Sequence, residues 1–222
     1  MTRGEFRQRP GGVIRVILAV GLTALLAACG TRHPPPPEPA PAPQAHAPAS
    51  CFATLDARGI GYERVPDFHT ADGCGIDQAI RVDRSAVPWN RPAMVACSFE
   101  LVEWDFETKV VQPIAWRIFK RHVSKLIHAG TYDCRGERGG NPSRLSQHAF
   151  GKAIDLLGFE IDDGTTISVR RDWVGETAKA QFLHDVAKGA CKLFDVVLTP
   201  YSNALHQDHI HMDTGPYKLC GM

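Results

Sequence analysis

The chain has 222 residues, of which 44% are hydrophobic and 22% are charged, a composition typical of a globular protein. Residues 1–28 hold four of its 25 basic and one of its 24 acidic residues, so the remainder has a net charge of about −2. Because this balance offers no attraction for a polyanion, we expect no nucleic-acid partner.

The first 28 residues are predicted to be a lipoprotein signal peptide. Four arginines precede an apolar run, VILAVGLTALLAA, that is too short to span a bilayer comfortably. The run ends in LAAC at Cys29, which resembles the bacterial signal that is cut before a cysteine whose thiol is then acylated. With Gly30 next, the resemblance implies a lipid anchor in the periplasm, at the outer membrane. An ordinary signal peptide followed by a chance cysteine is the alternative.

Residues 29–49 are rich in proline and alanine, a composition that cannot bury a core and favours extended polyproline geometry. We interpret this segment as a tether that spans roughly 50–60 Å, at about 3.1 Å per residue. A ligand for a proline-binding module is the alternative. The working domain is then residues 50–222, which is long enough for one substantial core.

Six cysteines follow Cys29, and an even number behind an export signal predicts three disulfides whose pairing the sequence leaves open. These cysteines are Cys51, Cys74, Cys97, Cys134, Cys191 and Cys220. A cysteine-ligated zinc site is disfavoured because no pair has the close Cys-x-x-Cys spacing.

The body of the chain is predicted to contain both helices and strands. Apolar residues between Pro92 and about Phe119 recur at helical spacing, which predicts a core helix with a kink or break at Pro113. A short helix ending at Gly59 and an amphipathic helix over 176–190 are also predicted. The predicted strands lie within 73–82, 125–134, 152–161, 165–169, 195–200 and 209–213. Because helices and strands are grouped rather than alternating, we expect an α+β fold with a mostly antiparallel sheet and flanking helices.

Two stretches have the residue types of a metal site. SQHAFGKAID (146–155) contains His148 and Asp155, and HQDHIHMD (206–213) contains three further histidines. A catalytic zinc ion usually has three protein ligands and one position for water. On a strand, His209 and His211 would point to the same face, so that one can bind the metal while the other stands beside the water.

SQHAFGKAID fills every position of the Ser-x-His-x-x-Gly-x-Ala-x-Asp signature of a group of zinc peptidases. This group includes D-alanyl-D-alanine carboxypeptidases, lysostaphin-type endopeptidases and the hedgehog fold. Together with HAGTYDCR (128–135) and HQDHIHMD, the region from Cys51 to Cys220 resembles the bacterial extensin-like C-terminal domain family. The resemblance implies the zinc-peptidase type of α+β fold.

The resemblance also implies the ligands, His148, Asp155 and His211, which would hold one Zn²⁺ per chain. The carboxypeptidase branch supplies its base from Glu-x-x-His and the lysostaphin branch from His-x-His. This chain offers Asp208-x-x-His211 and His209-x-His211 together. We favour His209 as the base, with Asp208 orienting a ligand or acting as the base itself.

Three more residues are candidates for contact with a substrate. Arg135 follows the GTY segment near the place where carboxypeptidase relatives carry an arginine that steadies substrate or oxyanion; an exposed loop arginine is the alternative. Ser146 is a substrate or ligand contact or a turn-forming serine, and His206 is a substrate contact or a surface histidine.

The implied function is a zinc-dependent peptidoglycan hydrolase that cleaves stem-peptide or crossbridge amides, as an endopeptidase or carboxypeptidase on D,D or L,D bonds. The expected partners are peptidoglycan peptides and, through the lipid anchor, a membrane; the sequence identifies no protein partner. The alternative is a non-catalytic peptidoglycan-binding envelope lipoprotein with a structural zinc site.

Overall fold

The structure, a computed structural model, describes residues 50–141 and 143–222. The predicted signal peptide (1–28), the lipidation site at Cys29 and the tether (29–49) lie outside the described residues. Among the residues described, no helix is long and apolar enough to cross a membrane.

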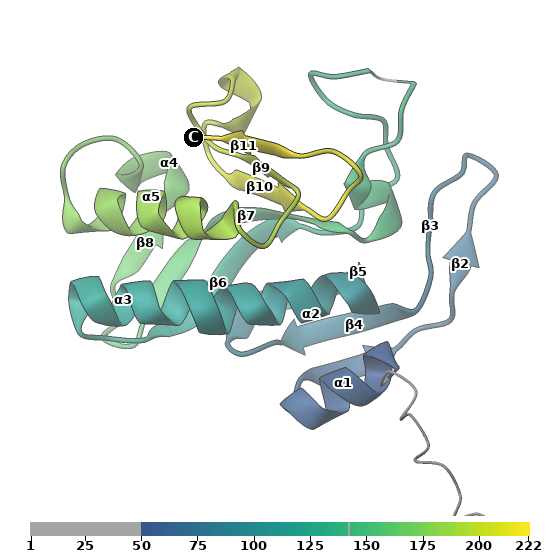
Figure 1. The fold of residues 1–222 in the computed structure, drawn as a ribbon, viewed down its shortest axis with the longest axis horizontal. Helices are drawn as coiled ribbons and strands as arrows, with labels where there is room; N and C mark the ends of the chain where they lie inside the picture. Colours follow the sequence, from purple (N-terminus) through teal and green to yellow (C-terminus); the bar gives the residue numbers. More distant parts are fainter. Residues whose placement is uncertain (1–49, 142) are drawn as a thin grey trace, which may run out of the picture. The chain divides into compact units, whose positions relative to one another are not determined.

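A nine-stranded sheet forms the centre of the domain (Figure 1), in the order β1-β4-β5-β6-β7-β10-β9-β11, with β8 paired to β7. Its strands are β1 (Gly61–Arg64), β4 (Ala79–Arg84), β5 (Pro88–Ala96), β6 (Val123–Gly130), β7 (Ala153–Ile161), β8 (Thr166–Ser168), β9 (Val196–Leu198), β10 (Ile210–Asp213) and β11 (Leu219–Gly221). A separate hairpin pairs β2 (Phe68–His69) with β3 (Gly75–Ile76). β7, one of the two nine-residue strands, pairs with β6, β8 and β10.

The α+β class is confirmed, but the expectation of a mostly antiparallel sheet is only partly right, because the sheet is mixed. The pairings β5–β6 and β9–β11 are parallel. Each joins strands separated by a long segment, and such a crossover can return the chain in the same direction. This segment contains α2 and α3 between β5 and β6, and the strand β10 between β9 and β11.

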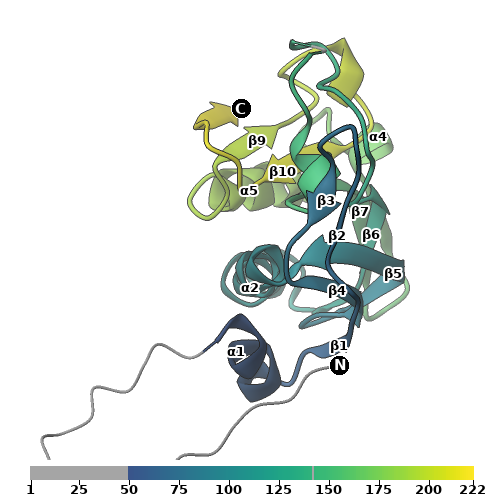
Figure 2. The same ribbon diagram turned by 90° about the vertical axis from the view of Figure 1, so that its right-hand side faces the viewer.

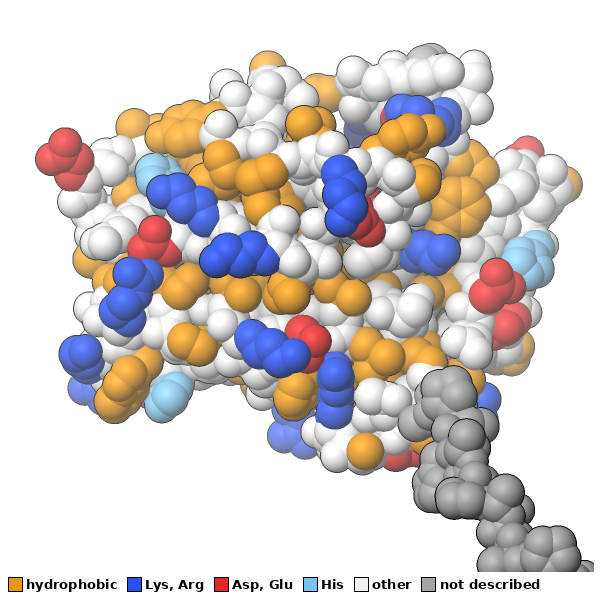
Figure 3. Space-filling view, in the orientation of Figure 1, with side chains coloured by type: hydrophobic (Ala, Val, Ile, Leu, Met, Phe, Trp, Pro, Cys, Tyr) orange, Lys and Arg blue, Asp and Glu red, His pale blue; other side chains and the backbone are white. Residues whose placement is uncertain are grey.

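The helices cover one face of this sheet. They are α1 (Cys51–Arg58), α2 (Cys97–Phe106), α3 (Gln112–Phe119), α4 (Val169–Asp172) and α5 (Ala178–Ala190). Figure 1 shows α5 alongside α3, and Figure 2 shows α2 and α5 on the same side of the strands. The predicted apolar stripe of α5 is confirmed, since Phe182, Val186 and Ala190 are fully buried. On the outer side of these helices, Lys and Arg side chains alternate with hydrophobic and polar ones (Figure 3).

The long helix predicted from Pro92 begins later than expected. Met94 and Val95 belong to β5, where they pair with Arg81 and Ile80 of β4. A short apolar run fits a buried strand as well as a helix, so periodicity alone could not place this boundary. The predicted kink or break corresponds to a π-helical segment, η1 (Glu107–Val111), which interrupts the α-helical pattern between α2 and α3. Pro113, which has no N–H to donate to the preceding turn, follows it directly in the first turn of α3.

Three disulfides form, as the cysteine count predicted. Cys51–Cys97 links α1 to the start of α2, and Cys74–Cys134 links the β2–β3 hairpin to the segment after β6. Cys191–Cys220 links the end of α5 to β11. The third bond fixes a strand of only three residues at the edge of the sheet, where pairing alone gives little stability.

The core also contains three glutamates that the sequence analysis did not single out. Glu100, Glu103 and Glu107 are fully buried along one face of α2 and the start of η1. Glu107 accepts hydrogen bonds from the Trp89 indole at 2.8 Å and the Val87 amide at 3.0 Å. Burial still raises the pKa of Glu107 to about 7. Burial, together with repulsion from Glu107 and Glu100, raises the pKa of Glu103 well above its ordinary value.

We expect Glu103→Gln to make the stability of the fold less sensitive to a rise in pH. A carboxyl with a raised pKa in the folded state stabilises fully below its unfolded pKa, about 4.3, and loses that contribution as pH rises through the folded value. The glutamine cannot lose a proton. As the pH rises from 5 to 8, the free energy of unfolding should therefore fall less in the variant than in the wild type, by on the order of 1 kcal/mol.

Chemical denaturation at both pH values measures this difference. Glu63→Gln, at an exposed position, is the control and should show little change with pH. Parallel pH profiles for Glu103→Gln and the wild type would contradict the expected role of burial.

Candidate metal centre

Three side chains from distant parts of the sequence bring one donor atom each to a common point. His148 Nε2 lies 3.1 Å from Asp155 Oδ1 and 3.2 Å from His211 Nδ1. His211 Nδ1 lies 3.0 Å from the same Asp155 oxygen. Within the described part of the chain, these residues form a group whose ligand atoms all lie within 4.8 Å of one another, and the group could hold a metal ion.

His148 is held by a single 3₁₀ turn, η2 (Gln147–Phe150). Ser146 caps this turn, its Oγ accepting the His148 amide hydrogen bond at 3.4 Å. The turn ends at Gly151, which has a φ of 61°, and a Cβ there would lie 3.0 Å from the Ala96 backbone nitrogen. Only glycine fits such a left-handed, closely approached position, which explains the glycine between the two ligands.

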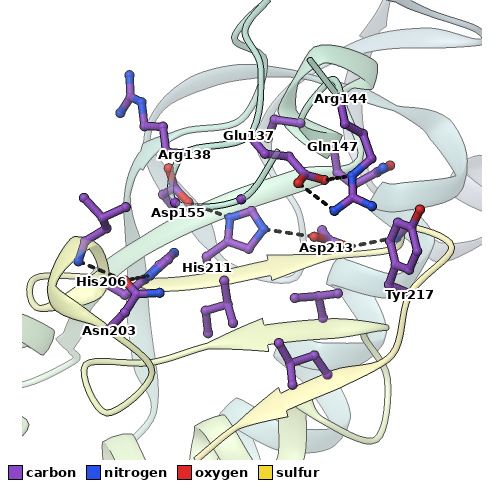
Figure 4. A pocket seen from close by; sticks show the side chains of 18 of the residues that line it. Glu137, Arg138, Arg144, Gln147, Asp155, Asn203, His206, His211, Asp213 and Tyr217 are labelled. Atoms are coloured by element: carbon purple, nitrogen blue, oxygen red, sulfur yellow. Dashed lines mark hydrogen bonds and ion pairs between the residues drawn. The ribbon is translucent and has the colours of Figure 1, made fainter. Parts of the chain in front are cut away.

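The other two ligands come from paired strands. His211 on β10 lies directly opposite Asp155 on β7 in the antiparallel register. Opposed residues in such a pair point to the same face of the sheet, so their side chains meet above it. Figure 4 shows His211 between Asp155 and Asp213.

Hydrogen bonds behind the ligands orient both imidazoles. His148 Nδ1 bonds to the Thr131 carbonyl oxygen, which can only accept, so Nδ1 is the donor in this bond and Nε2 is the nitrogen that faces the other two ligands. His211 Nε2 bonds to Asp213 Oδ2 at 3.0 Å, which leaves Nδ1 facing Asp155. Partners of this kind fix the ring orientation and increase ligand basicity at metal sites.

The electrostatics of the cluster favour positive charge at its centre. Burial opposes ionisation of Asp155, but hydrogen bonds from His148 and His211 outweigh it and hold the pKa of this carboxyl well below its ordinary value. Burial likewise opposes a charge on His211, yet bonds to Asp155 and Asp213 raise its pKa to about 9. A metal cation bound between the three donor atoms would supply this positive charge.

The dimensions suit a small divalent ion. Tetrahedral donors about 2.0–2.1 Å from zinc lie about 3.3–3.4 Å from one another. The three distances here, 3.0–3.2 Å, need only a small outward shift to reach that separation. Two imidazoles and one carboxylate are also a common set of protein ligands for catalytic zinc, which leaves a coordination position open.

Of the two candidate bases, His209 lies nearer the centre. It precedes β10 rather than belonging to it, and its Nε2 is 3.6 Å from Asp155 Oδ1. Asp208 is 54% exposed and bonds to His209 Nδ1 at 2.8 Å, on the other side of the ring. The geometry therefore gives Asp208 the position of a residue that orients His209.

The remaining candidates line one groove of about 400 Å³ that opens beside the centre. The Arg135 guanidinium lies in its wall and donates to Asp133 at 2.8 Å. His206 is buried rather than a surface histidine, and its ring bonds to Asn203 at 2.8 Å. Burial, and then proximity to His209 and His211, lowers the pKa of His206 to about 4.

Three groove residues were missed by the sequence analysis. Arg144 donates to Glu137 through two bonds, one of 2.7 Å, and its guanidinium lies 4.5 Å from the Tyr217 ring centre. Figure 4 shows this group at the end of the groove opposite Asn203 and His206. No local pattern in the sequence indicates this group, because Tyr217 meets Glu137 and Arg144 only where its loop contacts theirs.

We expect Asp213→Asn to weaken metal binding by about 10- to 100-fold, because the amide supports the His211 ring less well than a carboxylate. Competition with a chromophoric chelator, using Zn²⁺ or Co²⁺, measures the affinity. Asp195→Asn is the matched control, since this aspartate pairs with Lys218 at 3.0 Å in the same part of the sheet. Equal affinities in Asp213→Asn and the wild type would show that Asp213 does not support the site.

A comparison with known protein families gives a match over most of the chain. The family model described as extensin-like protein C-terminus matches residues 49–221. No curated protein and no solved structure matches the chain. The match covers most of the chain, including all three metal-site residues, and the chain therefore belongs to the extensin-like protein C-terminus family.

Proposed function

We propose that this protein is a zinc-dependent hydrolase that cleaves amide bonds in the peptides of peptidoglycan. One observation carries the proposal: three oriented donor atoms meet beside an open groove that is lined by two of the three ligands, Asp155 and His211, and by a further imidazole, His209. A purely structural site would be closed by a fourth protein ligand. The SQHAFGKAID signature supports the same reading through its resemblance to the zinc peptidases.

We propose one Zn²⁺ per chain, held by His148, Asp155 and His211. Zinc in such a site supplies Lewis acidity and makes water a nucleophile near neutral pH. The chain itself holds the donors in place through Thr131 and Asp213.

His209 is proposed as the general base. Asp208 holds the Nδ1 side of its ring, so Nε2 is left to take a proton from the attacking water and then deliver it to the leaving amine. Arg135, whose side chain is still able to donate from its remaining N–H groups, is proposed to stabilise the negative charge that develops on the carbonyl oxygen.

The proposed substrate depends also on the proposed location. A chain anchored through Cys29 in the periplasm, at the outer membrane, with a tether over residues 29–49, would reach the peptidoglycan layer. Ser146 caps the turn of His148 and lines the groove with His206, so both are proposed to contact the bound peptide.

We expect the metal-loaded protein to release new muropeptides from purified sacculi. Chromatography and mass measurement identify the bond that is cut and distinguish endopeptidase from carboxypeptidase products. A chelator should abolish the release and Zn²⁺ should restore it, and His211→Ala should lose both metal and activity. A fully metallated and fully active His148→Ala variant would contradict the ligand assignment.

We expect His209→Ala to keep its metal but lower kcat by about 10²- to 10⁴-fold, the usual contribution of a general base. Asp208→Asn should have a smaller effect, because it only loosens the ring. His69→Ala is the control, since His69 is exposed on the β2–β3 hairpin.

Unaltered muropeptides from a zinc-loaded wild type would favour the alternative, a wall-binding lipoprotein with a structural metal. The absorption spectrum of the cobalt-substituted protein then distinguishes four protein ligands from three.

A further inference from the structure

The floor of the groove has a polar half and an apolar half, and the strand register places both on one face of the sheet. His211 and Asp213 of β10 lie opposite Leu198 and Val196 of β9. Val196 in turn lies opposite Leu219 of β11. Since opposed residues share a face, Val196, Leu198 and Leu219 line the groove beside the metal centre, as its lining residues confirm. We call these three residues the apolar patch.

The apolar patch is only partly covered. Leu219 is 55% exposed, Val196 and Leu198 are partly buried, and at the rim Leu205 and Tyr217 are each 52% exposed. On the opposite face of β9, Val197 is fully buried in the core. β9 therefore has apolar side chains on its groove side as well as on its core side, and those on the groove side can contact an apolar part of a ligand.

The apolar patch lies within a few residues of a reacting amide along an extended peptide. Neighbouring strands are about 4.8 Å apart, so β9 and β11 lie about 5 and 10 Å from the His211 row. An extended peptide advances about 3.3 Å per residue. With a carbonyl at the three ligands, a side chain about one or two residues away reaches β9 and one about three residues away reaches Leu219 on β11.

The charged groups at this end of the groove compensate one another. Arg144 is bound by Glu137 and stacks on Tyr217, and Lys218 pairs with Asp195 at 3.0 Å. A charged substrate side chain lying on the patch would lose hydration without gaining a free partner. An uncharged aliphatic side chain would gain contact with Leu198 and Leu219 instead.

We propose that the apolar patch is a specificity subsite: a substrate residue within about three positions of the cleaved amide carries an uncharged aliphatic side chain that packs on Val196, Leu198 and Leu219. This inference rests on the proposed amide hydrolysis and adds the class of substrate to it. Cys191–Cys220 serves the subsite by holding β11, and with it Leu219, beside β9.

Peptides that differ only at one position, taken in turn from the first to about the third residue beside the amide, test the proposal. With the metal-loaded wild type, KM should be lowest for alanine or leucine and at least about tenfold higher for aspartate or lysine. Leu219→Asp should raise KM for the aliphatic peptides about tenfold, leave kcat within about twofold, and improve the lysine peptide. Leu219→Asn should raise KM without favouring lysine.

Val174→Asp is the matched control, because Val174 is 78% exposed and does not line the groove. It should leave every KM unchanged. An exposed strand position tolerates these substitutions, and unaltered metal content and circular dichroism show that the fold is retained. Identical KM values for Leu219→Asp and the wild type on all peptides would overturn the subsite.

Calorimetric binding of the same peptides to metal-loaded His209→Ala separates this inference from the proposed function. Tighter binding of the aliphatic peptides, lost when Leu219→Asp is added to His209→Ala, supports the subsite. If the wild type then hydrolyses none of the peptides, only the proposed hydrolase is rejected. Hydrolysis without any side-chain preference overturns the subsite and leaves the hydrolase standing. Absence of both binding and hydrolysis overturns both.

Discussion

The antiparallel pairing of β7 with β10 is the constraint on which the candidate site depends. It places His211 opposite Asp155, although 56 residues separate them in the sequence. A slip of one residue would turn His211 into the core and Ile210 or Met212, both fully buried, into the groove. The large cost of exposing those two apolar side chains holds the register, so the hydrophobic face of β10 fixes the geometry of its polar face.

The neighbouring elements extend this frame in two directions. On one side, the glycine-ended turn η2 carries His148 to the carboxylate of Asp155, and the Thr131 carbonyl at the end of β6 fixes its ring. On the other side, β9 and β11 continue the sheet with aliphatic side chains. The same sheet face therefore offers metal donors and an apolar surface within a few ångströms, which joins the proposed chemistry to the proposed selection of substrate.

Much of the fold could be predicted from local patterns. The hairpin of β7 and β8 around Asp162–Gly164 follows from alternation and turn residues, and the buried stripe of α5 follows from helical spacing. The start of α2 was misplaced because Met94 and Val95 suit either a strand or a helix, and pairing with β4 decides between them. The parallel pairings could not be predicted, since strand direction depends on how distant segments pack.

For the site, the sequence by itself determined the types and spacing of the candidate donors, because His148, Gly151 and Asp155 act through a short turn whose geometry is local. It also determined that six cysteines were available for three bonds. Only the tertiary structure decided that His211 joins this pair, that Asp208 lies behind His209, and that Glu137, Arg144 and Tyr217 meet at the end of the groove. The physical reason is that His211 and Tyr217 are far in the chain from the residues that they contact, and strand register and loop packing, which bury apolar area across the whole domain, determine where they meet. Asp208 and His209 are adjacent, but their side-chain directions are set by the same packing.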